Sequence, residues 1–262
     1  MESKNRNWWK VELETKPDFN MAMKRIYAWY EGSIIDRVPV RFSRHNVEYE
    51  NVDSYNQWQG KELKKRWFDT EYQLNLFKNT IQAKSFKAET FPVYWPNLGP
   101  DVYAAFFGNS LRFGEITSWS EPLIKEGDDI SHIKFDKKNQ YFVKLEQMMN
   151  MALTECEGKY LVGYTDLHTG LDCVMAWMGQ NALCLDLYDS PQNVKQLLEL
   201  ATRDFNSIYD HFDSILKQNN QLSVTWMEIP FFETMHIPSC DFSALISPEH
   251  FREFYLPYLK KK

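Results

Sequence analysis

Apolar and polar positions along the chain follow two periods, one typical of helices and one typical of strands. Short apolar runs predict strands at 38–46, 88–95, 160–166 and 223–229. Helical spacing predicts helices at 18–31, 56–84, 139–156 and 190–218, a short one at 102–107, and a last one that opens at Ser247 and Pro248. Ser190 and Pro191 have the N-cap and first-turn positions of the clearest helix, and Gly114 marks a hairpin.

Helices and strands therefore alternate, with connections long enough for parallel crossovers, and this predicts an α/β protein. Polar side chains follow the strands: Arg44 and His45 after the first, Asp166 and His168 after the third, and Glu228 at the end of the fourth. In a (β/α) barrel, sites are built at that rim, although a doubly wound sheet also binds ligands there. The chain has no G-x-G-x-x-G or Walker motif, which weighs against nucleotide binding.

Charge and composition limit the classes of partner and the cell compartment that are expected for this protein. A net charge of −6 without a basic stripe argues against nucleic acid, and no apolar run reaches the ~20 residues that span a bilayer. The N-terminal MESKNRNWWK lacks a signal-peptide core, and four widely spaced cysteines suit a reducing compartment. We therefore expect a cytoplasmic protein. The 16% aromatic content, with nine Trp, fits a stacking surface or simply core bulk.

Several segments together resemble the uroporphyrinogen decarboxylase superfamily, which also contains corrinoid-protein methyltransferases. DRVPVRFSRHN at 36–46 is similar to that family's first strand, with its Asp-Arg-x-Pro-Val entry. LVGYTDLHTGLDCVMAWMG at 161–179 resembles the third strand and its loop, and Asp-Ser-Pro-x-x-Val opens the long helix. LISPEHFREFYLPYL at 245–259 is the most specific match, to Leu-Ser-Pro-x-x-Phe-x-x-Phe-x-x-Pro-Tyr. Residues 50–140 match only loosely.

The resemblance implies a (β/α)8 TIM-type barrel. About four barrel strands are reached by Met227, whereas eight units need ~250 residues without insertions, so the barrel is expected to be incomplete. An open half-barrel leaves an unpaired strand edge. We therefore expect residues 18–262 to be the barrel domain of a longer, C-terminally truncated chain, or one whose sheet a partner completes, preceded by an extension at 1–17.

Two candidate residues come from comparison with the decarboxylase pattern. That family's Met-Arg-Gln-Ala-Gly-Arg carries two arginines that hold substrate carboxylates; Arg44 falls on the first and Glu48 on the second. The reversed charge at Glu48 argues against orthodox uroporphyrinogen decarboxylation. Asp101 roughly matches the aspartate that binds pyrrole nitrogens, although an aspartate after Pro is also a common helix N-cap.

The exit of the third strand carries the first choice of catalytic groups. Asp166 and His168 alternate with Leu167, so both can face one rim, where a carboxylate orients an imidazole for acid–base work. Asp172 is the third polar group of this exit. The alternative is that Asp166 caps the next helix and His168 is a plain rim residue. Tyr164 falls on a family Phe or Tyr position and is expected to form a wall.

Three further residues are candidates for substrate binding. Trp226 and Glu228 have the spacing of one strand face, and Asp241 precedes the last helix, where the family often has an acidic residue. His236 and Cys240 supply only two metal ligands, and zinc needs at least three. We therefore assign no metal site in the chain. A methyltransferase of this family would bind zinc through ligands beyond residue 262.

Function is expected to be that of a superfamily enzyme, either a decarboxylase acting on a tetrapyrrole or a methyltransferase working with a corrinoid protein. The cofactor follows that choice: none within this segment for a decarboxylase, zinc and the corrinoid protein for a methyltransferase. The partner is a small-molecule substrate, not nucleic acid or a membrane, and the resemblance makes a homodimer plausible. A carbohydrate-active barrel and a catalytically silent binding relative stay open as alternatives.

Overall fold

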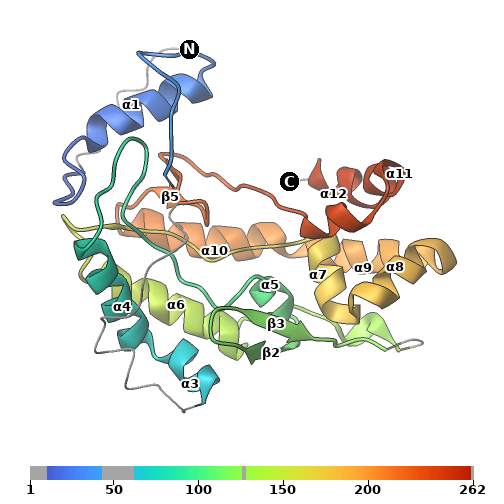
Figure 1. The fold of residues 1–262 in the computed structure, drawn as a ribbon. Helices are drawn as coiled ribbons and strands as arrows, with labels where there is room; N and C mark the ends of the chain where they lie inside the picture. The colour runs from blue at the N-terminus through green and yellow to red at the C-terminus, as the bar shows by residue number, and fades with distance from the viewer. Residues whose placement is uncertain (1–10, 43–61, 126–127, 261–262) are drawn as a thin grey trace.

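The computed structural model describes residues 11–42, 62–125 and 128–260 (Figure 1). Strands in this part of the chain are short: β1 Val93–Tyr94, β2 Ser110–Phe113, β3 Ser118–Glu121, β4 Leu161–Val162, β5 Ser223–Val224 and β6 Pro230–Phe231. Helices up to β4 are α1 Phe19–Tyr30, α3 Leu63–Phe68, α4 Thr70–Gln82, α5 Val102–Ala105, the 3₁₀ turn η3 Ile130–His132 and α6 Gln140–Leu153. After β4 come α7 Leu171–Met178, α8 Gln180–Asp189, α9 Pro191–Arg203, α10 Phe205–Gln218, the 3₁₀ turn η4 Asp241–Leu245, α11 Pro248–His250, the π-helical turn η5 Phe251–Tyr255 and α12 Leu256–Leu259.

Four extended segments lie side by side in chain order and form the frame of the site. β1 and β4 pair in parallel, with Val93 opposite Leu161. On one side, the Glu89 N–H donates to Val40 O at 2.9 Å and brings residues 38–42 beside the start of β1. On the other, the Tyr164 N–H donates to Val224 O at 3.3 Å and brings β5 beside β4. This order is the one that successive β/α units produce, so the described residues have an α/β arrangement without forming a closed barrel.

The strand residues alternate between two apolar clusters. Val93 and Leu161 pack with α1 in the smaller cluster, whereas Tyr94 and Val162 pack into the larger cluster, which the helices cover. This alternation is the period of two that a strand imposes. Gly163 continues β4 because a Cβ there would lie 2.9 Å from Val224 O, so only glycine lets β5 approach.

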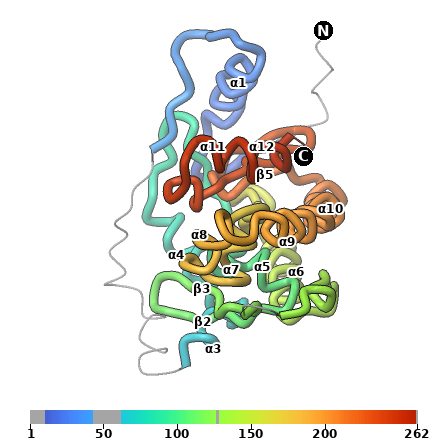
Figure 2. Tube along the Cα trace, turned by 90° about the vertical axis from the view of Figure 1, so that its right-hand side faces the viewer, coloured from blue at the N-terminus to red at the C-terminus, as the bar shows by residue number. Residues whose placement is uncertain are grey.

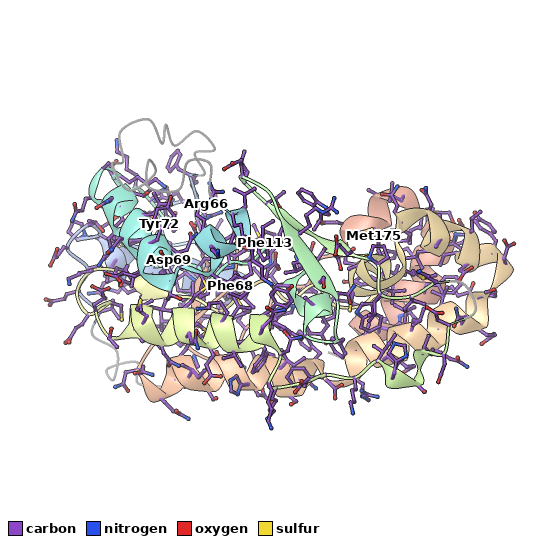
Figure 3. The ribbon with its side chains drawn as sticks, turned by 90° about the horizontal axis from the view of Figure 1, so that it is seen from below. Arg66, Phe68, Asp69, Tyr72, Phe113 and Met175 are labelled. Carbon is purple, nitrogen blue, oxygen red and sulfur yellow. The ribbon has the colours of Figure 1, made fainter. Side chains whose placement is uncertain are left out.

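A helical layer and an antiparallel hairpin cover this frame. The predicted hairpin around Gly114 is confirmed as β2 and β3, with Leu111 opposite Ser120. Figure 3 shows Arg66, Phe68, Asp69 and Tyr72 of the α3–α4 corner in the same region as Phe113 of β2, and the Phe68 and Phe113 rings are 5.8 Å apart, edge to face. Near the end of the described chain, η5 and α12 lie against α9 (Figure 2).

Three predicted elements differ from the structure for local reasons. Of the helix expected at 56–84, residues 56–61 lie outside the described residues, and the rest is broken at Asp69, whose side chain accepts the Tyr72 N–H and starts α4 anew. The helix expected at 190–218 is likewise divided at Asp204 into α9 and α10. The strand expected at 223–229 ends at Val224, because Thr225 O accepts the Glu228 N–H at 2.8 Å and closes a turn.

Two predicted strands are shorter than expected, and a third has no strand in its described part. The strand at 88–95 is reduced to Val93–Tyr94, and that at 160–166 to Leu161–Val162. Residues 38–42 of the first predicted strand are extended beside β1 without regular pairing, and 43–46 lie outside the described residues. Residues 11–17 of the predicted extension pack on the domain, where the Glu14 N–H donates to Gly158 O at 2.8 Å. Along the described chain, no helix is long and apolar enough to cross a bilayer.

Candidate functional site

The site forms where the chain leaves β4 and runs, buried, to α7. Asp166 is only 5% exposed, and Thr165 and Thr169 on either side are also buried. The turn into α7 is made by Gly170 at φ +72°, which is the N-cap residue of that helix. The alternative expectation, that Asp166 caps the next helix, is therefore wrong. Its carboxylate is directed instead to a histidine two residues further on.

His168 lies between two carboxylates. Its Nε2 is 2.7 Å from Asp166 Oδ1, and its Nδ1 is 3.8 Å from Asp172 Oδ2. Burial lowers the pKa of His168, but the Asp166 carboxylate 2.7 Å from Nε2, together with the charges of Asp172 and Asp241, outweighs burial and raises that pKa above its usual value. The two carboxylates thereby favour the charged form of the imidazole more than water does for a free histidine. We call Asp166, His168 and Asp172 the carboxylate–histidine cluster.

Asp172 is held by backbone donors from a distant segment. It lies in the first turn of α7, where a carboxylate also complements the helix dipole. The Asp241 N–H donates to its Oδ2 at 3.0 Å and the Phe242 N–H to its Oδ1 at 2.8 Å. Burial raises the pKa of Asp172 above its usual value, and these two bonds oppose that rise. Asp241 thus reaches the cluster through its backbone, while its own carboxylate accepts from Ser239 Oγ at 3.1 Å.

Asp101 lies close enough to His168 for their charges to interact. Burial raises the pKa of Asp101, while a hydrogen bond from Ser120 and the charge of His168 lower it. Although Asp101 precedes α5, its side chain makes no cap bond; Oδ2 accepts the Ser120 N–H of β3 at 2.7 Å. The N-cap alternative for this side chain is therefore wrong. Ser120 itself has no signal in the sequence that would have selected it.

Trp226 and Glu228 separate in the turn that follows β5. The Trp226 ring meets the His168 ring edge to face at a centroid distance of 6.2 Å, and its Nε1 donates to Ile237 O at 3.4 Å. Glu228 has φ +57° and pairs with Arg41 from the first extended segment. The expectation that the two side chains share one strand face is wrong because the backbone is a turn there.

Tyr164 belongs to a second polar group, on the side of α10. Its hydroxyl donates to Met235 O at 2.8 Å and lies 3.4 Å from His236 Nδ1. Tyr209 also donates to Met235 O, at 2.9 Å, accepts the Met235 N–H at 2.9 Å, and lies 3.3 Å from Ser223 Oγ. Ser223 in turn donates to the buried Asp213. We call Tyr164, Tyr209, Ser223 and Asp213 the tyrosine network.

Other predicted residues fall outside the site or outside the described chain. Arg44, His45 and Glu48 lie in 43–61, beyond the described residues. His236 packs against Phe205 at a ring distance of 4.9 Å. Within 11–42, 62–125 and 128–260, no three His, Cys, Asp or Glu side chains are arranged to hold a metal ion.

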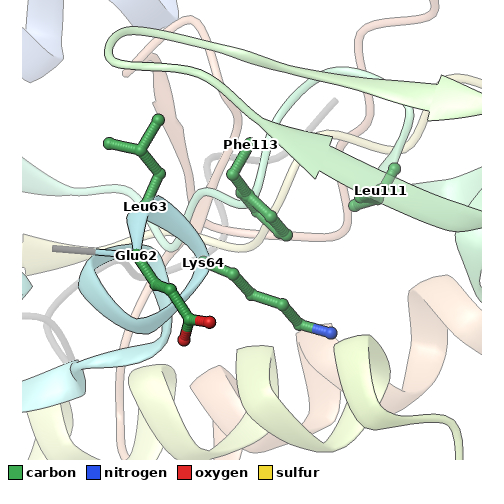
Figure 4. Close-up of a pocket in the computed structure, with 5 residues that line it drawn as sticks. All are labelled: Glu62, Leu63, Lys64, Leu111 and Phe113. Carbon is green, nitrogen blue, oxygen red and sulfur yellow. The ribbon is translucent and has the colours of Figure 1, made fainter.

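A hollow of about 350 Å³ lies elsewhere on the molecule (Figure 4). Glu62, Leu63 and Lys64 at the start of α3 face Leu111 and Phe113 of β2 across it. None of these lining residues belongs to the carboxylate–histidine cluster. The hollow therefore carries no part of the candidate chemistry.

Comparison with known proteins gives one informative match. No protein-family model matches the chain, and no curated protein matches it in sequence. Among solved structures, a methyltransferase from Methanosarcina mazei superposes with a TM-score of 0.63 at 11% sequence identity. The match covers 92% of this chain and 65% of that one, so the chain spans about two thirds of the methyltransferase's length. At this identity the likeness shows the fold alone, a fold consistent with the resemblance of the sequence motifs.

Proposed function

We propose that the chain contributes the substrate-facing rim of an enzyme that transfers a methyl group between a heteroatom of a small molecule and an acceptor carried by a partner. The resemblance of its motifs suggests a corrinoid protein as that partner. The observation that carries the proposal is the His168 side chain, 10% exposed, between Asp166 and Asp172, 2.7 Å and 3.8 Å away. The superposable fold of a methyltransferase supports the same reaction class.

The chemistry needs a proton at the heteroatom that loses the methyl group. The bond between the methyl carbon and the heteroatom breaks, its electron pair stays on the heteroatom, and the acceptor supplies the pair for the new bond to carbon. The protonated His168 gives its proton to the heteroatom, and in the reverse direction neutral His168 removes it. Asp166 and Asp172 keep the ring oriented and favour its charged form.

The remaining rim residues have supporting roles in this scheme. Trp226 forms an aromatic wall beside the imidazole, and Asp101 adds negative charge on the side of β3. The described residues do not fit a zinc site, because no group of three suitable ligands occurs among them. We therefore assign every step to side chains and none to a metal.

A methyl-transfer assay tests the proposal. The full chain is incubated with methylcobalamin and a panel of small thiols, amines and alcohols, and both the absorbance of the corrinoid and the methylated product are followed. We expect His168→Gln to reduce the rate by about 10²-fold to 10⁴-fold, the usual contribution of a positioned acid or base.

His211 provides a matched control, because it also pairs with a carboxylate, with Nε2 3.2 Å from Glu146 Oε2 between α10 and α6. His211→Gln should keep the wild-type rate. A wild-type chain that methylates none of the panel, or a His168→Gln variant as fast as wild type, would rule the proposed function out.

A further inference from the structure

Tyr255 lies at the point where the last helices meet the site. It ends the π-helical turn Phe251–Tyr255 between α11 and α12 and is only 3% exposed. An extra residue in one helical turn rotates every later position by about 100°, so the π turn decides which way Tyr255 points. Single π turns of this kind occur frequently at functional sites.

The ring of Tyr255 packs on the turn that follows His168. A Cβ added to Gly170 would lie 3.0 Å from Tyr255 Cε2 and 3.3 Å from Cδ2. Gly170 also has φ +72°, a conformation that residues with a Cβ adopt reluctantly. The ring therefore covers the backbone between His168 and α7 at a distance that only glycine allows.

The hydroxyl of Tyr255 holds the other support of the cluster. It donates to Ser239 O at 2.9 Å. Two and three residues later, the Asp241 and Phe242 N–H groups bind the carboxylate of Asp172. One side chain thus contacts both the turn that carries His168 and the segment that fixes the partner of His168.

We propose that Tyr255 is a positioning residue for His168, acting through the Gly170 turn with its ring and through the 239–242 segment with its hydroxyl. The inference rests on the proposed function only in giving His168 the proton-transfer role. The contacts themselves concern where the imidazole and Asp172 are held. Losing the hydroxyl bond frees the 239–242 segment and weakens the hold of Asp172 on the imidazole, while Asp166 stays in place.

The test is the titration of His168, followed by NMR of the imidazole nitrogens in the full chain without substrate. The signal is assigned by its loss in His168→Gln. Tyr255→Phe keeps the ring on Gly170 and removes only the hydroxyl. We expect the pKa of His168 to fall by about 0.5 unit or more in this variant, because the coupling to Asp172 weakens.

Tyr258 offers a matched control on the same segment. It is also buried, and its hydroxyl donates to a backbone oxygen, Lys195 O, at 3.2 Å in α9. Tyr258→Phe should lower the melting temperature about as much as Tyr255→Phe and leave the titration of His168 unchanged. Equal titration of His168 in wild type, Tyr255→Phe and Tyr258→Phe would overturn the inference.

Gly170→Ala tests the ring contact separately, and it keeps the inference testable if Tyr255→Phe does not fold. The added Cβ pushes the ring and the turn apart, so this variant should also shift the titration of His168. An unshifted titration in folded Gly170→Ala would contradict the ring's role. Because no substrate is present, these outcomes are independent of methyl transfer: the positioning role fails on the titration, and the proposed function fails on the rate of His168→Gln.

Discussion

Asp166 of the carboxylate–histidine cluster lies two residues after Tyr164 of the tyrosine network on the same chain segment. The two groups nevertheless compensate for the burial of their polar atoms in different ways. In the tyrosine network, Tyr164 and Tyr209 share one carbonyl, Met235 O, and Ser223 passes a hydrogen bond on to Asp213. Its hydroxyl groups stay neutral and tie the 235–236 loop to α10. This is how a fold satisfies buried polar atoms while gaining stability.

The carboxylate–histidine cluster instead concentrates charge. Asp166 and Asp172 both lie against His168, and Asp101 and Asp241 add further negative charge nearby. Burying several carboxylates around one imidazole is unfavourable unless each is held by a partner. The difference teaches that hydrogen bonding alone does not mark a site: the network joins neutral hydroxyl groups, whereas the cluster gathers ionisable groups around one imidazole, as the proposed proton transfer requires.

The largest effect is expected from removing the anchored carboxylate. Asp172→Ala leaves two backbone N–H groups without their acceptor, the buried one of Phe242 and the partly buried one of Asp241. We expect a loss of about 3 kcal/mol in the free energy of unfolding, measured by urea denaturation. Asp172→Asn keeps an acceptor oxygen and should lose less. An Asp172→Ala variant as stable as wild type would mean that the cluster is not held as the structure indicates.

Tyr209→Phe should cause the next largest loss in the free energy of unfolding, and this loss measures how much the tyrosine network stabilises the fold. The variant removes both the donor to Met235 O and the acceptor of the Met235 N–H. A loss of about 2 kcal/mol is expected in the same denaturation experiment, with methyl transfer unchanged. Tyr188→Phe, at a tyrosine 73% exposed on α8, is the control and should change stability by less than about 0.5 kcal/mol. A large fall in activity in Tyr209→Phe would show that the two groups work as one.

The contrast between the two groups also explains which residues of the candidate site could be predicted from the sequence. Asp166, His168 and Asp172 lie within seven positions at one strand exit, so their meeting follows from local geometry once the strand is recognised. Asp101 was found only through the family pattern. The tyrosine network was missed as a group: Tyr164 was expected only to form a wall, and the other members come from α10 and β5 and carry no motif.

Contacts that depend on an irregular backbone could not be predicted. The pairing of Glu228 with Arg41 requires the turn closed by Thr225, whose local hydrogen bond competes with the strand that the apolar pattern favours. Tyr255 reaches Gly170 only because of the π turn, and hydrophobic periodicity does not reveal such a shift in register. The role of Asp241 was predicted for its carboxylate, whereas its backbone N–H makes the contact.

The third prediction concerns the pH dependence of stability, which should differ between the cluster and the network. The expected change in the free energy of unfolding is smaller than for the two substitutions above. The pKa of His168 in the folded protein is raised above its unfolded value of about 6.5. Its contribution to the free energy of unfolding is therefore complete below about pH 6.5 and is lost as the pH rises through the folded pKa. Each unit of upward shift corresponds to about 1.4 kcal/mol. Urea denaturation curves of His168→Gln, collected at a series of pH values, should no longer show this fall in the free energy of unfolding as the pH rises.

The tyrosine hydroxyl groups of the network should lose their stabilising effect only in strong alkali. Burial raises the pKa of Tyr209 to about 12. The contribution of Tyr209 to the free energy of unfolding therefore persists until the pH exceeds the pKa of an unfolded tyrosine, about 10. A wild-type stability that does not fall as the pH rises above about 6.5 would contradict the raised pKa of His168.

Tyr164→Phe is expected to have the smallest effect and gives the sharpest comparison, because Tyr164 lies only two residues before Asp166. Its hydroxyl shares Met235 O with Tyr209, so that carbonyl keeps a donor when the Tyr164 hydroxyl is removed. The expected loss is about 1 kcal/mol or less, with the NMR titration of His168 unchanged. Because the charge of Asp166 reaches Tyr164, an altered titration would instead mean that the network tunes the cluster through this one residue. In that case the division between a stabilising group and a reactive group would have to be given up.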